Sequence, residues 1–154
     1  MYQSILVPID GGPVSRKGLD LAIQTAKMSG GRLRLMHVID ETVFALTATS
    51  YSGGVGDILP LLREAGTQTL SDAKARVEAQ GVHVDTVLRE SMEGRVCDLV
   101  MDEAAAWPAD LIVIGTHGRR GVRRALLGSD AEQILRLANV PVLLVRGDEP
   151  PSGQ

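Results

Sequence analysis

Short apolar runs alternate along the whole chain with longer segments in which apolar residues recur at helical spacing. The runs at 4–9, 33–39, 110–115 and 142–145 are rich in Ile, Leu and Val, as strands covered on both faces usually are. Strand–helix alternation of this kind requires parallel strands joined by right-handed crossovers. We therefore predict a single doubly wound α/β domain, Rossmann-like, with helices on both faces of the sheet.

Helices are predicted at 13–29, 58–80, 93–106 and 129–138, where the apolar spacing changes to the helical period. The first should end at Gly30-Gly31, because glycine adopts the left-handed conformation of a helix C-terminus at low cost. A further strand at 82–88 alternates apolar and polar residues, which predicts an edge strand with one wetter face. The predicted sheet has five strands in the order 3-2-1-4-5.

Length and composition favour one domain with an aliphatic core. The chain has 154 residues, 44% of them apolar and only 3% aromatic. We assign the domain to 1–147 and expect the polar, Pro-containing tail at 148–154 to be disordered. Residues 42–57 follow neither period and are expected to form a mobile loop, which at this length is usually functional or disordered.

Charge and cysteine content exclude several classes of protein. The formal net charge of −3 and a pI of about 5.6 argue against a general nucleic-acid binder or a binder of anionic membranes. Cys97 is the only cysteine, so no intrachain disulfide forms, and its apolar neighbours predict a buried thiol. The sequence shows neither an export signal nor a membrane-spanning run, and we expect a cytoplasmic protein.

The segment 115–129 carries the strongest functional signal, because it leaves a buried strand and enters a helix. Gly115 and Gly118 would let the backbone turn and approach a ligand, while Gly128-Ser129 begins a helix whose free N–H groups attract anions. Positive charge gathers between the glycines, on Arg119, Arg120, Arg123 and Arg124. Phosphate is the ligand that this pattern favours.

Structural interpretations compete with the functional one at each of these positions. Ser129 and Glu132 also fit a capping box, which would satisfy backbone donors at the start of the helix without any ligand. A glycine-rich segment with four arginines is more often a solvated surface. The case for phosphate therefore rests on the spacing and placement of the residues together.

That spacing, Gly115-x2-Gly118-x9-Gly128-Ser129, resembles the G-x2-G-x9-G-[S/T] pattern of the ATP-binding branch of the universal stress protein family. The flanking segments are similar to that family as well, so that the resemblance covers nearly all of residues 2–146. These segments are 5–10, 37–39, 109–118 and 140–145.

The resemblance implies a nucleotide site and a dimer. Asp10 and the backbone around Val38 would hold the adenosine, with Gly115 near the ribose. Phosphates would contact Gly118, Gly128 and Ser129. The candidate set is completed by Pro8, Ile9, Arg119 and Asp130. The implied ligand is ATP, or ADP or AMP, with or without Mg²⁺, and the implied homodimer pairs strands 142–145. Taken alone, Asp10 before Gly11-Gly12 would be a turn former and Val38 a core residue.

Asp130 departs from the family pattern, which usually has an apolar residue after the Gly-Ser pair. Its repulsion of a phosphate charge ~8 Å away would be about 2 kcal/mol at an effective dielectric of ~20. This exceeds the stabilisation of about 0.3–1 kcal/mol that the helix dipole gives an aspartate at this position. Three explanations remain open. A divalent cation bridges Asp130 and the phosphates, the arginines compensate, or the protein prefers fewer phosphates than ATP carries.

No catalytic or metal constellation is visible. The sequence has no Walker A motif, and its three histidines and single cysteine lack metal-ligand spacing. We therefore predict no metal site within the protein and a regulatory binding module, in which nucleotide orders the segment 115–128. The alternatives are a slow nucleotide hydrolase or transferase using the same pocket, and a structural stress protein that binds no nucleotide.

Overall fold

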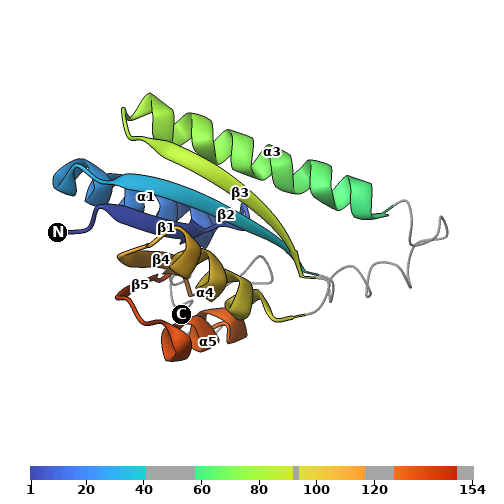
Figure 1. Ribbon diagram of the computed structural model, residues 1–154. Coiled ribbons are helices and arrows are strands. Elements are labelled where there is room, and N and C mark those ends of the chain that lie inside the picture. The colour runs from blue at the N-terminus through green and yellow to red at the C-terminus, as the bar shows by residue number, and fades with distance from the viewer. Residues whose placement is uncertain (41–57, 92–93, 117–126, 149–154) are drawn as a thin grey trace, which may run out of the picture.

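A computed structural model describes residues 1–40, 58–91, 94–116 and 127–148, which form a five-stranded parallel sheet in the order β3–β2–β1–β4–β5 (Figure 1). The strands are β1 (Ser4–Pro8), β2 (Arg32–Asp40), β3 (Val84–Ser91), β4 (Leu111–Gly115) and β5 (Val142–Val145). The helices are α1 (Pro13–Ser29), α3 (Ile58–Ala79), α4 (Val96–Ala106) and α5 (Ser129–Leu137). The predicted fold class and strand order are confirmed.

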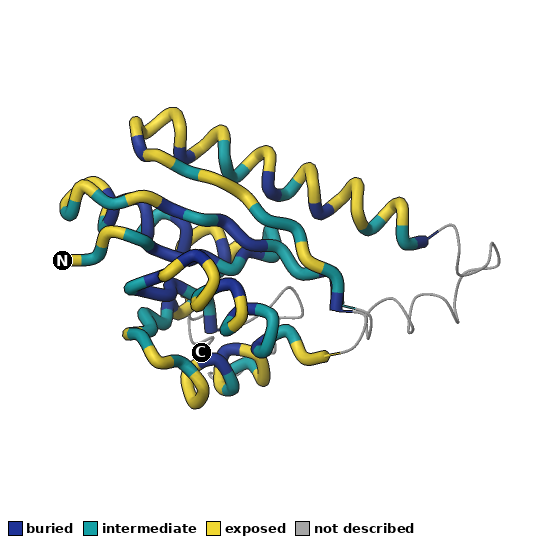
Figure 2. Tube along the Cα trace, viewed as in Figure 1, coloured by how far each residue is buried: buried dark blue, intermediate teal, exposed yellow. Residues whose placement is uncertain are grey.

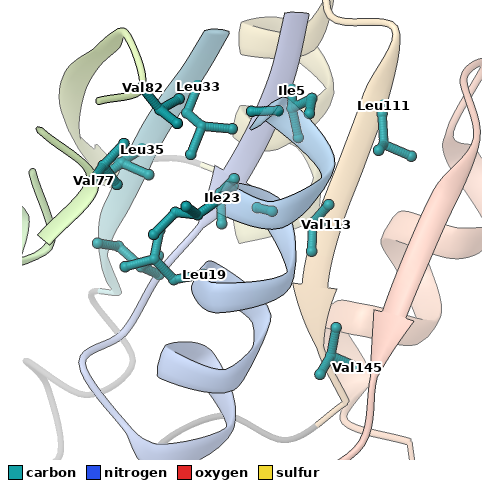
Figure 3. Close-up of a cluster of buried hydrophobic side chains, with 14 of the residues drawn as sticks. Ile5, Leu19, Ile23, Leu33, Leu35, Val77, Val82, Leu111, Val113 and Val145 are labelled. Carbon is teal, nitrogen blue, oxygen red and sulfur yellow. The ribbon is translucent and has the colours of Figure 1, made fainter. Parts of the chain in front are cut away.

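Two apolar layers hold the helices against opposite faces of the sheet. Ile5 and Val7 of β1 point toward α1 and α3, whereas Leu6 between them points toward α4 and α5. Figure 3 shows the first layer, in which Leu19 and Ile23 of α1 meet side chains from several strands. Because side chains alternate between the faces of a strand, short apolar runs are needed to supply both layers.

The outer surfaces of the helices are exposed, and the covered strands are the most buried part of the described chain (Figure 2). Cys97 lies in the layer under α4 and is buried, as predicted. Gly30 ends α1 in the left-handed conformation with φ 69°, also as predicted. Among the described residues, no helix is both long and apolar enough to span a bilayer.

Several element boundaries differ from the prediction. Strand β3 covers 84–91 instead of 82–88, because Val82 still closes the end of α3 through a bond from its N–H to the carbonyl of Val77. Pairing with β2 then continues to the register pair Asp40–Ser91. Helix α4 begins at Val96 instead of 93, since Gly94 has φ 152° and Arg95 is extended.

The predicted loop 42–57 lies outside the described residues. Of the predicted tail, Asp148 is described, and its carboxylate accepts a hydrogen bond of 2.6 Å from Lys17 Nζ on α1. Residues 149–154 lie outside the described part.

Candidate functional site

A pocket of about 840 Å³ opens at the carboxyl ends of the strands, within the range of about 300–1,000 Å³ typical of small-molecule sites. Its walls come from the ends of β1, β2 and β4, the first turns of α4 and α5, and one side of α3. Every predicted site residue that the structure describes lines it: Pro8, Ile9, Asp10, Val38, Gly115, Gly128, Ser129 and Asp130. Gly118 and Arg119 lie outside the described residues.

A smaller cavity of about 340 Å³ adjoins this pocket between α1 and α3. The two share Ile9, Ser15 and Thr69, but none of the described residues of the segment 115–129 lines the smaller one. The described residues that the sequence predicts for the phosphates therefore line the larger pocket alone.

Asp10 is a turn former that also lines the pocket. Its Oδ1 accepts a hydrogen bond of 2.7 Å from the N–H of Gly12, which makes it a turn former. Its own N–H donates to Ser15 Oγ at 3.1 Å, and Gly11 between them has φ 80°. The same carboxylate lines the pocket, and its Oδ2 has no hydrogen-bond partner among the described residues.

The backbone N–H and C=O of Val38 point to the side of β2 that pairs with β1. Strand β1 ends before it reaches Val38, so it does not pair with these groups. The carbonyl of Met36 accepts a bond of 2.8 Å from Ile9 N–H, so Met36 faces β1. Val38 lies two residues further along and faces the same way, because alternate residues of a strand direct their backbone groups to the same side. Strand β1 pairs with β2 only as far as Met36.

His37 fixes the neighbouring end of β1. Its Nδ1 lies 2.8 Å from the carbonyl oxygen of Ile9, and since a carbonyl can only accept, Nδ1 carries the proton. The ring also packs against Gly66 of α3, where an added Cβ would lie 2.8 Å from His37 Cδ2. Both His37 and Gly66 line the pocket.

Gly115 has a packing role that the sequence did not suggest. A Cβ at Gly115 would lie 2.8 Å from Val14 Cγ1, so the glycine allows the first turn of α1 to pack against β4. Next to it, the carbonyl of Thr116 accepts a bond of 2.6 Å from Gly128 N–H. This bond joins the end of β4 to the start of α5 beside the pocket.

Two helices begin at the pocket without a side-chain cap. Gly128 is the N-cap of α5 and Arg95 that of α4, and neither makes a side-chain cap hydrogen bond. The capping-box interpretation is therefore wrong, because Ser129 is the first helical residue of α5 and not its N-cap. First-turn N–H groups and the helix dipole make such ends favourable for anions.

Arg95 is the cation that lines the described part of the pocket, and no pattern in the sequence predicted it there. Its guanidinium donates to both carboxylate oxygens of Asp98 at 3.1 Å, and its Nη1 donates to Gln133 Oε1 at 2.9 Å. Gln133 also accepts from the thiol of Cys97 at 3.0 Å. Burial is the main cause that raises the pKa of this thiol.

Asp130 and Asp40 are the further carboxylates of the pocket. Asp130 is solvent-accessible but lies within the concave wall, where desolvation raises its pKa, and the negative charge of Asp40 raises it further. In the described ranges, no three His, Cys, Asp or Glu side chains gather as metal ligands. His117 lies outside these ranges.

The doubly wound sheet with its pocket at the switch point between β1 and β4 defines the chain as a Rossmann-like α/β protein. The universal stress protein family model matches residues 1–146. The chain therefore belongs to the universal stress protein family.

Individual relatives agree with this assignment. Universal stress protein MJ0531 of Methanocaldococcus jannaschii is 35% identical over 146 residues, covering 95% of this chain and 83% of the relative. Universal stress protein YxiE of Bacillus subtilis is 31% identical, covering 95% of this chain and all of the relative. The solved structure of hypothetical protein MJ0577 has a TM-score of 0.84 and 24% identity over 97% of this chain and 99% of its own, which supports the fold.

Two structural neighbours are described with an adenine nucleotide. One is a universal stress protein in complex with cAMP, with a TM-score of 0.67 and 24% identity over 96% of this chain and 98% of its own. The other, from Archaeoglobus fulgidus, is in complex with dAMP, with a TM-score of 0.67 and 23% identity over 94% of this chain and 98% of its own.

Proposed function

We propose that this chain is a regulatory binding module of the stress response that holds an adenine nucleotide, ATP, ADP or AMP, in the pocket at the carboxyl ends of its strands. One observation carries the proposal. The described residues expected at the adenosine and those expected at the phosphates, which are far apart in sequence, line a single pocket.

Two groups of residues that line the pocket differ in chemistry as a nucleotide requires. The outward-directed backbone of Val38 offers a donor and an acceptor for the edge of a base, and Asp10 offers an acceptor for ribose hydroxyls. The N–H of Gly128 is bonded to Thr116, but the uncapped first turn of α5 from Ser129 onward offers N–H groups for a phosphate. A Mg²⁺ ion would enter with the nucleotide, coordinated by its phosphates.

Titration calorimetry with Asp10 variants tests this function. Asp10→Ala removes the pocket acceptor and the turn acceptor together, and we expect the dissociation constant for adenine nucleotides to rise by about tenfold or more. Asp10→Asn keeps a side-chain oxygen for Gly12 N–H and should fold normally, yet lose part of the affinity, because a neutral acceptor binds a hydroxyl less strongly than a carboxylate.

Asp102→Asn is the matched control, since Asp102 is an exposed carboxylate on α4 that does not line the pocket. It should bind as wild type does. Wild-type protein that gives no heat with AMP, ADP or ATP in the presence of magnesium would contradict the function. A binding module should also bind close to one nucleotide per chain with negligible multiple turnover.

The module is further proposed to work in the cytoplasm as a homodimer paired through 142–145. The buried thiol of Cys97, which makes no disulfide, suits a reducing compartment. Strand β5 is an edge of the sheet, which leaves one side of 142–145 without a strand partner in the described chain.

A further inference from the structure

The hydrogen-bond ladder between β1 and β2 stops one bond short of the residue whose backbone faces the pocket. The N–H of Ile9 donates to the carbonyl of Met36 at 2.8 Å, just beyond the last register pair of the two strands. In a continued parallel ladder, the carbonyl of Ile9 would next accept a bond from the N–H of Val38. Among the described residues, no bond joins Val38 N–H to Ile9.

The side chain of His37 takes the place of that main-chain donor. Its Nδ1 lies 2.8 Å from the carbonyl oxygen of Ile9 and donates to it. Because its carbonyl is already satisfied, Ile9 does not need the N–H of Val38, and Val38 lines the pocket instead.

Helix α3 holds the imidazole ring in this position. Gly66 leaves room for the ring, because a Cβ there would lie 2.8 Å from His37 Cδ2 and 3.3 Å from Nε2. Leu88 of β3 is the register partner of His37, and its Cδ1 would lie 3.0 Å from the same Cβ. The ring is therefore confined while its Nδ1 stays bonded to Ile9.

A turn leaves the carbonyl of Val38 open in a similar way. In a continued ladder this carbonyl would accept a bond from the N–H of Gly11. Gly11 instead has φ 80° and lies in the turn closed by the bond of 2.7 Å from Gly12 N–H to Asp10 Oδ1. In the described chain, no bond from Gly11 to Val38 forms. Both polar backbone groups of Val38 are thus available at the pocket.

We propose that His37 is a positioning residue of the pocket, which donates to the Ile9 carbonyl in place of Val38 and so reserves the Val38 N–H for the edge of a bound base. This inference rests on the proposed function and adds a residue to its site. Without a donor at position 37, the ladder would close by one bond, and a bound base would compete with Ile9 for the same N–H.

Amide hydrogen exchange, followed by NMR on the nucleotide-free protein, tests the state of the ladder. In wild type, the Ile9 amide should be protected at least about a hundredfold, whereas the Val38 amide should exchange within about tenfold of an open chain. In His37→Leu, the Val38 amide should become about tenfold or more slower to exchange, as it bonds to Ile9. His37→Asn should behave as wild type, because the N–H of an asparagine lies close to the position of Nδ1.

Calorimetry with AMP tests the consequence for binding. His37→Leu should raise the dissociation constant by about five- to tenfold, the effect of one lost hydrogen bond, and His37→Asn should stay within about twofold of wild type. Since Asn and Leu have nearly the same shape, the difference between them reports the donor and not the packing. Adding AMP to wild type should also slow the exchange of the Val38 amide.

His83→Leu is the matched control, because His83 is exposed and does not line the pocket. It should leave both AMP binding and the exchange of Val38 unchanged. If His37→Leu does not fold, His37→Ser, which is too short to reach the carbonyl of Ile9, takes its place.

The outcomes separate this inference from the function it rests on. A Val38 amide that is protected in nucleotide-free wild type would overturn the inference, and so would a His37→Leu variant that binds AMP as tightly as wild type. Equal losses of affinity in His37→Leu and His37→Asn would assign the ring to packing alone. If wild type binds neither AMP nor ATP while its Val38 amide is unprotected, the proposed function fails and the early end of the ladder stands.

Discussion

Glu103 is a charged side chain held in the interior by two arginines. Its side chain is 3% exposed, and its two oxygens accept bonds of 2.7 Å from Arg34 Nη1 and from Arg89 Nη2. Arg34 also pairs with Asp85 and lies over the ring of Trp107. Burial acts to raise the pKa of Glu103, but the two arginines outweigh it and leave the pKa below its ordinary value.

Replacing Glu103 by Gln should cost about 1–3 kcal/mol of unfolding free energy, because two arginines lose their charged acceptor. A carboxylate with a lowered folded pKa contributes its stability above its ordinary pKa of 4.5 and loses it as pH falls through the folded value. The deficit of Glu103→Gln, measured by urea unfolding, should therefore be full at pH 7 and shrink below pH 4.5. A deficit independent of pH would argue against this account.

At the scale of elements, two helical glycines should respond oppositely to alanine. A Cβ at Gly18 in α1 would meet its nearest atoms at 3.8–4.0 Å, which is ordinary contact, so Gly18→Ala should stabilise the protein by up to about 1 kcal/mol. A Cβ at Gly66 in α3 would lie 2.8 Å from His37 Cδ2 and 3.0 Å from Leu88 Cδ1. His37 is tied to Ile9, so it has little room to move, and Gly66→Ala should cost about 1–3 kcal/mol.

Thermal unfolding of the two variants beside wild type measures both effects, and each variant serves as the helix-propensity control for the other. If both substitutions stabilised the protein, helix propensity would outweigh the contact between α3 and His37. If both destabilised it, the expected space around Gly18 would be wrong.

The elements themselves were predictable because their causes are local. Strand β1 lies between helices on both faces, so its apolar run is a direct consequence of its position. Boundaries were less predictable, since the end of β3 at Ser91 depends on how far β2 continues beside it. The capping box at 129–132 failed for the same reason, because the bond from Gly128 to Thr116 places the helix start one residue earlier.

The glycine-rich part of the site was likewise readable from spacing, whereas its other wall was not. Asp40 directly follows the strand predicted at 33–39, as Asp10 follows the one predicted at 4–9, so the same rule about strand ends would have found it. Arg95 and Gln133 gave no such signal. They meet only because α4 and α5 pack side by side. A single sequence does not specify which helices pack against each other, or which of their residues are then in contact.

At the scale of the whole molecule, the two edges of the sheet differ in composition. The edge strand β3 carries charged side chains at Asp85, Arg89 and Glu90, which discourage pairing with another sheet. Strand β5, at the opposite edge, is Val-Leu-Leu-Val without a charge. An apolar, uncharged edge of this kind is suited to pairing with a second copy of the chain, the dimer proposed above.

The backbone direction of β5 allows a sharp test of that dimer. The carbonyls of Pro141 and Val145 accept bonds from β4, at 3.0 Å from Ile112 N–H and 2.9 Å from Thr116 N–H, so residue 144 directs its N–H away from β4. Leu144→Pro should therefore leave the sheet folded but remove a donor from the open edge. In light scattering, the variant should give a mass near 16.4 kDa, whereas wild type should give twice that mass.

Leu143→Pro is the control with opposite geometry, because residue 143 faces β4 and its N–H belongs to the sheet. It should reduce stability in urea unfolding whatever the oligomeric state, whereas Leu144→Lys should repeat the monomeric mass of Leu144→Pro without unfolding. Wild type that stays monomeric at high concentration, with and without nucleotide, would rule out pairing through β5. A dimer that survives Leu144→Pro would place the contact elsewhere on the surface. In such a dimer each copy lacks the N–H of residue 144, so the two β5 edges cannot form the hydrogen bonds that pair them.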